Sequence, residues 1–356
     1  MSAGSLVFDS EGEGCGEDEP MLTRRRFAGL VAASALTSGT RMRPACAQGW
    51  PSRHVRSIVP FVPGGATDVI ARVIGNRLSE AWGQQVVVEN RGGAGANIGA
   101  QAVAQSDPDG YTLYITSVPH ATNRFLYSSL NYDPVADFAP VTLICTQSNI
   151  MVVPNSSPAK SVLEFISYAK AHPGQISYGS GGIGTSVHLS GELFKRIAGI
   201  EMTHVPYRGA APALQDVIAG RLDVIFDNIT ASLPQARNGA VRGLAVTAAR
   251  RVSAEPELPT IAEAGVPGFD VSTWFALFVP AIVRKINKDT VVTLGHPMVK
   301  ERLEQFGATL VGSTPEELAG FLQAEMDKWG LVIHDAKIKV EERNRRRQPR
   351  GSIGAA

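Results

Sequence analysis

The chain has 356 residues, of which 44% are hydrophobic and 19% charged, and its formal net charge is +1. This length and composition predict a globular protein with one large domain or two smaller ones. A charge so close to neutral gives no electrostatic support to nucleic acid or a membrane surface as a partner, so we expect neither.

Residues 1–47 are predicted to be an export leader that is cleaved from the folded protein. A basic segment at residues 21–27 precedes an apolar run, and Ala45-Cys46-Ala47 supplies the small residues of a cleavage site. The consecutive arginines before Phe27 are typical of the twin-arginine signal. Residues 1–20 are acidic, which is abnormal in such a leader, so Met21 is the expected start. The exported protein is expected to be soluble in the periplasm.

The sequence after the leader has few unusual features of composition. No apolar stretch after the leader is long enough to span a bilayer. Cys145 is the one cysteine after the expected cleavage point, which leaves no internal disulfide and no cysteine zinc site. The arginine-rich tail, residues 341–356, is predicted to be disordered, and we assign it no role.

A glycine turn follows the first expected strand. Residues 58–62 form an apolar run that predicts a buried strand, and Pro63-Gly64-Gly65 ends it. Thr67 or Asp68 is expected to cap the helix that follows at residues 69–82. A turn of this kind presents unpaired backbone N–H groups at a positive helix end, which suits an anion. An ordinary strand-to-helix turn in an α/β protein is the alternative interpretation.

Strand and helix patterns alternate along the rest of the chain, which predicts an α/β fold with a largely parallel sheet. Further strands are expected at residues 85–89, 111–116, 141–144, 149–154, 176–178, 204–207, 222–227, 241–246 and 271–278. Further helices are expected at residues 98–105, 161–171, 187–198, 211–219, 281–294, 297–306 and 315–333.

A second glycine loop, residues 179–186, precedes the helix expected at residues 187–198. Two such loops facing each other would form a cleft, where ligand sites usually lie. Residues 179–184 also match the dinucleotide pattern G-x-G-x-x-G, but the preceding strand is short and polar. Nucleotide binding is therefore the weaker interpretation, and the absence of a following lysine excludes a P-loop.

Two serine–histidine pairs could serve a hydrolase, Ser117 with His120 and Ser186 with His188. Neither serine lies in the nucleophile-elbow pattern G-x-S-x-G, and the histidines lack short metal-ligand spacings. We therefore expect no enzyme, no metal and no cofactor. An exported α/β serine hydrolase is the alternative.

Five motifs, in order along the chain, resemble those of the tripartite tricarboxylate transporter receptors, also called TctC or Bug periplasmic binding proteins. They are Val59-Pro60-Phe61-Val62-Pro63-Gly64-Gly65-Ala66-Thr67-Asp68, Val88-Glu89-Asn90-Arg91-Gly92-Gly93-Ala94-Gly95, Gly184-Thr185-Ser186-Val187-His188-Leu189-Ser190-Gly191-Glu192, His204-Val205-Pro206-Tyr207-Arg208-Gly209 and Phe226-Asp227-Asn228. The resemblance covers about residues 50–340.

This resemblance implies a type II periplasmic binding fold, in which two α/β lobes are joined by two crossing segments with a ligand cleft between them. Lobe 1 would comprise residues 48–153 plus 272–340, and lobe 2 residues 154–271, with the crossings near Pro154 and Ser272. The Gly-Thr-Pro turn of the family is missing after Val279-Pro280-Ala281, and we expect this to affect the start of the next helix.

The function implied is that of an extracytoplasmic, monomeric solute-binding protein. Its lobes would close on a small organic carboxylate: a dicarboxylate or tricarboxylate, an acidic amino acid or an aromatic acid. Membrane subunits of a tripartite tricarboxylate-type transporter, or a sensor, would recognise the closed form. The residues implied to bind the ligand are Pro63, Gly64, Gly65, Thr67, Asp68, Ser117, Ser180, Gly181, Gly184, Thr185, His188 and Asp227.

Overall fold

The computed structural model describes residues 50–280, 284–305, 307–335 and 338, and it divides into two units, residues 1–50 and 51–356. The expected leader, the expected tail and the position of the missing turn at residues 281–283 lie outside the described residues. All the elements below belong to the second unit. None of the described helices is long and apolar enough to cross a membrane.

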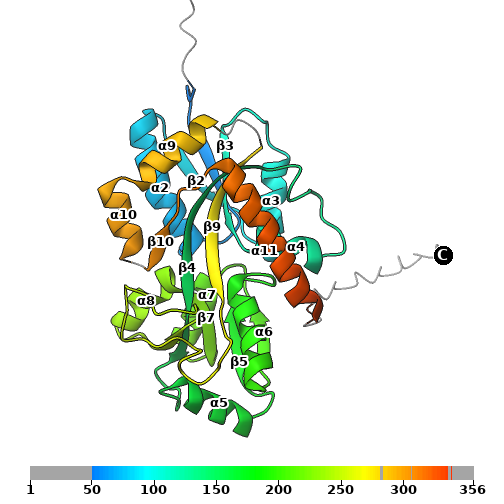
Figure 1. The fold of residues 1–356 in the computed structure, drawn as a ribbon, viewed down its shortest axis with the longest axis vertical. Coiled ribbons are helices and arrows are strands. Elements are labelled where there is room, and N and C mark those ends of the chain that lie inside the picture. Colours follow the sequence, from blue (N-terminus) through cyan, green and yellow to red (C-terminus); the bar gives the residue numbers. More distant parts are fainter. Residues whose placement is uncertain (1–49, 281–283, 306, 336–337, 339–356) are drawn as a thin grey trace, which may run out of the picture. The chain divides into compact units, whose positions relative to one another are not determined.

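The described strands form one sheet in the order β2-β1-β3-β9-β4-β7-β5-β6, with β8 and β10 paired to β4 (Figure 1). Their bounds are β1 Val55–Val59, β2 Val86–Asn90, β3 Thr112–Ser117, β4 Ala139–Pro154, β5 Ser177–Ser180, β6 Thr203–Pro206, β7 Val224–Asn228, β8 Val241–Val246, β9 Ser272–Val279 and β10 Ala308–Leu310.

The prediction of a largely parallel sheet is wrong, because β4 pairs antiparallel with β7, β8, β9 and β10. The parallel pairs are confined to the strands around β1 and β5. β4 was also expected as two strands, yet it is a single strand of 16 residues. Its polar centre stays in the sheet because Gln147 and Ser148 pair with Thr273 and Ser272 of β9.

The described helices are α2 Ala66–Trp82, α3 Asn97–Ala104, α4 Pro119–Leu126, α5 Val162–Ala171, α6 Ser186–Ala198, α7 Ala210–Ile218, α8 Ile229–Arg237, α9 Arg284–Leu294, α10 Pro297–Glu304 and α11 Pro315–Asp335, with a 3-10 turn η1 at Ala94–Ala96. Two of these helices, α4 and α8, were not expected from the sequence. Pro119 lies in the first turn of α4, where the missing N–H costs no intrahelical hydrogen bond. Pro234 lies inside α8, where a proline normally argues against a helix.

The helix after the first glycine turn begins at Ala66, three residues earlier than the expected residue 69. Thr67 and Asp68 therefore lie inside its first turn, and the prediction that one of them caps the helix is wrong. Gly65 is the N-cap residue, and it offers no side chain to the free N–H groups. The small residues after Pro63 allow the helix to start sooner than the capping rule suggested.

The strands β4 and β9 connect the two parts of the sheet (Figure 1). β9 and the first half of β4 pair with β3 and β10, whereas the second half of β4 pairs with β7 and β8. Both strands are almost entirely buried. Trp274 of β9 packs in the core and donates from Nε1 to Glu325 Oε2 of α11 at 2.8 Å, so the last long helix is fixed to this strand.

Candidate functional site

The N-terminal ends of five helices meet around one small cavity of about 30 Å³. Gly65 and Ala66 begin α2, Pro119 begins α4, Ser186 begins α6, Ala210 begins α7 and Asn228 precedes α8. The full lining is Phe61, Gly65, Ala66, Thr67, Ser117, Pro119, Gly181, Thr185, Ser186, Val187, Ala210 and Asn228. The two glycine loops expected from the sequence thus reach the same cavity.

These helix ends make the cavity positive without a cationic side chain. The first N–H groups of a helix have no partner within it, and the helix dipole places a partial positive charge there. The N-cap residues of α2, α4, α7 and α8 make no side-chain capping bond, so no N-cap side chain occupies the first N–H groups of these helices. No lysine or arginine lines the cavity. The arrangement suits an anion held by backbone donors.

Polar side chains add further donors to the lining. Ser117 Oγ lies 3.1 Å from Thr273 Oγ1 of β9. Asn228 Nδ2 donates to Asn149 Oδ1 at 2.6 Å, and it lies 3.4 Å from Ser186 Oγ. These hydroxyl and amide groups come from elements on either side of β4 and β9, so a ligand in the cavity would contact both parts of the sheet.

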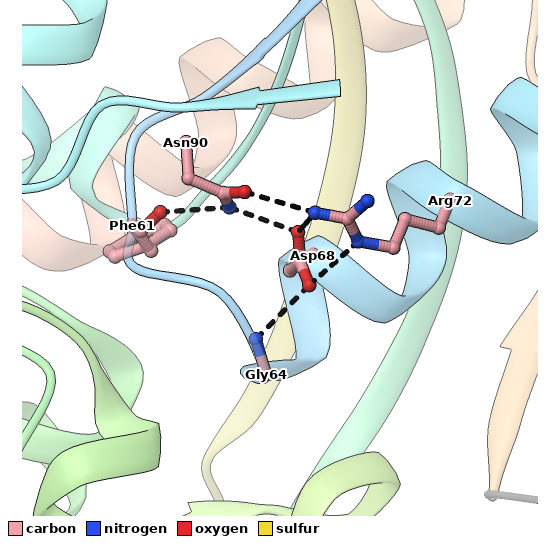
Figure 2. Close-up of polar contacts among 5 residues, drawn as sticks. All are labelled: Phe61, Gly64, Asp68, Arg72 and Asn90. Atoms are coloured by element: carbon pink, nitrogen blue, oxygen red, sulfur yellow. Dashed lines mark hydrogen bonds and ion pairs between the residues drawn. The ribbon is translucent and has the colours of Figure 1, made fainter. Parts of the chain in front are cut away.

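Asp68 lies beside the cavity, and its carboxylate fixes the first glycine turn (Figure 2). Gly64 N–H donates to Oδ2 at 3.0 Å, and Asn90 Nδ2 donates to Oδ1 at 2.9 Å. Arg72 donates from Nε and Nη2 to both oxygens at 3.0 Å. Burial alone would raise the pKa of the Asp68 carboxyl, but the Arg72, Gly64 and Asn90 donors together hold this pKa below its usual value. Asp68 is therefore an ionised anchor of the loop.

The second glycine loop is held by a buried serine and two histidines. Ser180 Oγ accepts from Gly182 N–H at 3.1 Å and lies 2.6 Å from His204 Nε2. His188 Nδ1 accepts from Gly184 N–H at 3.3 Å. Burial lowers the pKa of His188 to about 4 and that of His204 to about 3, so both rings are neutral at pH 7. A neutral ring is what lets His188 accept a hydrogen bond from the loop.

Each glycine loop or a segment next to it also approaches a segment from the other part of the chain. Thr122 Oγ1 of α4 donates to Gly184 O at 3.0 Å. A Cβ built on Gly182 would lie 3.5 Å from Gly95 Cα, and one built on Gly209 would lie 2.7 Å from Val62 Cγ2. The backbone around Gly95 therefore lies close to that around Gly182, and the backbone of Gly209 lies close to Val62.

Of the twelve residues implied to bind ligand, five line the cavity: Gly65, Thr67, Ser117, Gly181 and Thr185. The other seven lie outside its lining: Pro63, Gly64, Asp68, Ser180, Gly184, His188 and Asp227. Three of these seven, Asp68, Ser180 and His188, hold glycines of the two loops next to the lining residues through the hydrogen bonds described above. The roles of all twelve in binding stay a prediction.

Four lining residues, Phe61, Pro119, Ala210 and Asn228, lie outside the loops that the resemblance implies as ligand-holding. Ala66, Ser186 and Val187 also line the cavity and lie within those loops, residues 63–68 and 180–188, although they were not named individually. Pro119 and Asn228 stand at the starts of the two helices that were not expected. Ser186 and Asn228 lie within motifs that carry the family resemblance, and their positions directly before or at a helix start are the signal that could have identified them.

The serine–histidine pairs considered for hydrolysis are not joined by hydrogen bonds within the described part of the chain. Ser117 Oγ pairs with Thr273, and the ring of His120 packs 4.4 Å from that of Phe278. Ser186 Oγ is approached by Asn228, whereas His188 accepts from Gly184. A serine nucleophile needs a base within hydrogen-bond reach, so this geometry gives no support to a hydrolase that uses either of these two pairs. The described residues also contain no cluster of His, Cys, Asp and Glu that could hold a metal ion.

Asp227 is fully buried at the end of β7, where Ser232 Oγ donates to its Oδ2 at 2.6 Å. Burial raises the pKa of its carboxyl from 3.8 to about 6, against the hydrogen bonds from Ser232 and Asn228, which lower it. The folded protein therefore favours the protonated form. The stability that this preference provides is fully present below about pH 4 and is lost as the pH rises through about 6.

Asp227→Asn should remove this loss, because asparagine cannot ionise and its side-chain oxygen can still accept from Ser232. Between pH 4.5 and pH 7.5 we expect the free energy of unfolding of the variant to rise relative to that of the wild type by about 2 kcal/mol. Denaturant titrations at the two pH values measure this difference. An identical pH dependence in both proteins would show that Asp227 is ionised in the fold without penalty.

Several solved structures resemble this fold, among them the periplasmic binding protein BugD. BugD is 32% identical with a TM-score of 0.79, and the match covers 82% of this chain and 100% of that one. R. palustris Rpa4515, solved with adipate, is 41% identical with a TM-score of 0.79 over 82% of this chain and 100% of that one. MatC from Rhodopseudomonas palustris, with bound malate, is 33% identical with a TM-score of 0.76 over 80% of this chain and 100% of that one.

The family follows from the sequence comparisons. The family described as tripartite tricarboxylate transporter family receptor, TctC, matches residues 70–338. Protein BugT of Bordetella pertussis is 35% identical over 89% of this chain and 99% of that protein. A UPF0065 protein of a Pseudomonas species is 39% identical over 90% of this chain and 96% of that protein. The chain belongs to this receptor family, which confirms the resemblance and the type II periplasmic binding fold.

Proposed function

We propose that the protein is an extracytoplasmic solute-binding protein that captures a small organic carboxylate in the cavity where the five helices begin. The observation that carries this proposal is the convergence of five positive helix ends on one cavity with no cationic side chain in its lining. Aliphatic dicarboxylates are the first candidates, because two of the similar structures hold adipate and malate. Acidic amino acids, aromatic acids and tricarboxylates also carry carboxylate groups, so they belong in the same test.

Residues in and around the cavity take two roles in this proposal. Gly65, Thr67, Ser117, Gly181 and Thr185 contact the ligand, together with Ser186 and Asn228, which also line the cavity. Asp68, Ser180 and His188 position the loops through hydrogen bonds to Gly64, Gly182 and Gly184. An ionised Asp68 would repel a carboxylate, so its proposed contribution is to hold the Gly64 backbone rather than to touch the ligand.

Entry of the ligand requires the segments around the cavity to separate. A cavity of about 30 Å³ is about a tenth of the ~300 Å³ at the lower end of ordinary small-molecule sites. We propose that residues 48–153 with 272–340 form one lobe and residues 154–271 the other, and that they open about β4 and β9. A ligand that contacts both lobes then stabilises the closed state.

The closed state is what a partner would recognise. We propose that the protein is exported to the periplasm and acts there as a monomer. Its closed form would deliver the ligand to the membrane subunits of a tripartite tricarboxylate-type transporter, or would be recognised by a sensor. Membership of the receptor family supports this assignment.

A thermal-shift screen of the purified protein against organic acids and amino acids tests the proposal. At a concentration about 100-fold above the dissociation constant, a ligand adds about 2.7 kcal/mol of stability, which should raise Tm by several degrees. We expect at least one dicarboxylate to give such a shift. A protein that melts cooperatively and responds to no carboxylate in the panel would contradict the proposal.

A further inference from the structure

Two adjacent side chains of α4 hold segments that come from different parts of the chain, and neither side chain lines the cavity. Thr122 Oγ1 donates to Gly184 O at 3.0 Å, in the loop that precedes α6 (Figure 1). Asn123 Nδ2 donates to Gly95 O at 2.7 Å, in the turn that follows β2. The two side chains are 0% and 2% exposed. One turn of α4 therefore connects the second glycine loop with the turn after β2.

The turn after β2 has a strained backbone. Its residues Ala94–Ala96 have φ values of 48°, 60° and 79°, in the left-handed region that is unfavourable for alanine. Asn123 Nδ2 holds this turn through Gly95 O and also donates to Asn97 Oδ1 at 2.7 Å. The Tyr132 hydroxyl donates to the same Asn97 oxygen at 2.6 Å. Strained backbone persists where surrounding contacts hold it, and it clusters where a mechanism uses it.

The strained turn lies directly against the second glycine loop. A Cβ built on Gly95 would lie 2.9 Å from Ile183 O, and a Cβ built on Gly184 would lie 2.9 Å from Thr122 Oγ1. Gly95 and Thr122 belong to the proposed lobe 1, whereas Ile183 and Gly184 belong to the proposed lobe 2. These contacts lie outside β4 and β9, the strands about which the lobes are proposed to open. The Thr122 hydrogen bond would therefore break when the lobes separate.

We propose that Thr122 and Asn123 form a latch that holds the closed state of the protein. Asn123 fixes the turn Ala94–Ala96 within lobe 1, and Thr122 fastens α4 to Gly184 of lobe 2. This inference rests on the proposed function, because it requires the two lobes to open and close. Opening exchanges the Thr122 bond for bonds to water and leaves the Asn123 bonds intact. Thr122 is thus a positioning residue, which raises ligand affinity by stabilising the closed state alone.

Calorimetric titration with adipate and with malate, together with denaturant unfolding of the ligand-free protein, tests the latch. Thr122→Val keeps the shape of the side chain and removes its donor. We expect the affinity to fall by about three- to tenfold, the effect of losing one hydrogen bond. The unfolding midpoint of the ligand-free protein should stay that of the wild type, because the bond is absent from the open state. Thr122→Ser keeps a hydroxyl donor and should bind more tightly than Thr122→Val.

Thr142→Val is the matched control. Thr142 is also 0% exposed, and its Oγ1 donates to Ser313 O at 2.8 Å, but both residues belong to the proposed lobe 1. This bond is present whether the lobes are open or closed. The control should therefore lower the unfolding midpoint of the ligand-free protein and leave the affinity unchanged.

The outcomes separate the latch from the proposed function. If the wild type binds adipate or malate and Thr122→Val binds it equally tightly, the latch is wrong and the binding function stands. A fall in the ligand-free unfolding midpoint of Thr122→Val as large as that of Thr142→Val would also overturn the latch, because Thr122 would then support the fold in every state. If the wild type binds neither diacid, the proposed capture of aliphatic dicarboxylates is contradicted, and the latch fails with it.

Discussion

Replacing Gly65 by valine should abolish ligand binding while leaving the fold intact. The φ of Gly65 is −84°, which valine adopts without strain, and a Cβ at this position meets no atom within 4 Å. The open space is the cavity itself, which Gly65 lines and which measures only about 30 Å³. The new side chain would occupy the position of the ligand at the start of α2. We expect the thermal shift with the best carboxylate to disappear, which corresponds to a loss of at least about 100-fold in affinity.

Gly320→Val is the matched control for this variant. A Cβ at Gly320 also meets nothing within 4 Å, and the residue lies in α11, away from the cavity lining. This control should keep the wild-type ligand response. If Gly65→Val binds the carboxylate as tightly as Gly320→Val does, the ligand does not bind at the start of α2.

Asp68→Ala is expected to lower both stability and affinity. The side chain of Asp68 is 6% exposed and that of its partner Arg72 is 50% exposed, so the substitution leaves a half-buried cation and the Gly64 and Asn90 donors without their acceptor. Removal of one partner of a fully buried pair costs about 3–5 kcal/mol, and the exposure of Arg72 reduces this to about 2–3 kcal/mol. Denaturant unfolding measures the loss, and a titration with carboxylate measures the accompanying fall in affinity.

The exposed pair between Arg53 and Asp109 provides the comparison. Their side chains are 55% and 39% exposed, so Asp109→Ala should cost under about 1 kcal/mol and leave ligand binding unchanged. Equal destabilisation by the two alanine variants would mean that the Asp68 network contributes no more than a surface ion pair. Unchanged affinity in Asp68→Ala would show that the Gly64 turn does not need its carboxylate anchor.

The sequence predicted the two glycine loops and the helices after them because their signals are local. Glycine next to an apolar run marks a turn, and an amphipathic pattern after it marks a helix, so α2 and α6 were found to within three residues. The sheet was harder, since strand direction depends on partners far away in the chain. β4 pairs with β9 across more than a hundred residues, and nothing within either segment indicates that the pair is antiparallel.

The site was predictable where it depends on the loops and was missed where it depends on tertiary packing. Gly65 and Gly181 could be proposed because a glycine turn before a helix exposes N–H groups. Pro119 and Asn228 could not, because their helices contain unfavourable or mixed sequences and form against the rest of the core. The set of hydrogen bonds that Asp68 accepts from Arg72, Gly64 and Asn90 was likewise not predictable. It depends on the pairing of β2 with β1, which brings Asn90 to the turn.

The most direct test of the account compares one diacid with its uncharged diamide by equilibrium titration at pH 7. The acid should be the one that gives the largest thermal shift. Five helix ends, each favouring negative charge by roughly 0.3–1 kcal/mol, should make the diacid bind at least about tenfold more tightly than the diamide. Binding of the diacid alone, lost in Gly65→Val and kept in Gly320→Val, is the result that we predict. A diamide that binds as tightly as the diacid would contradict the claim that the converging helix ends form a carboxylate site.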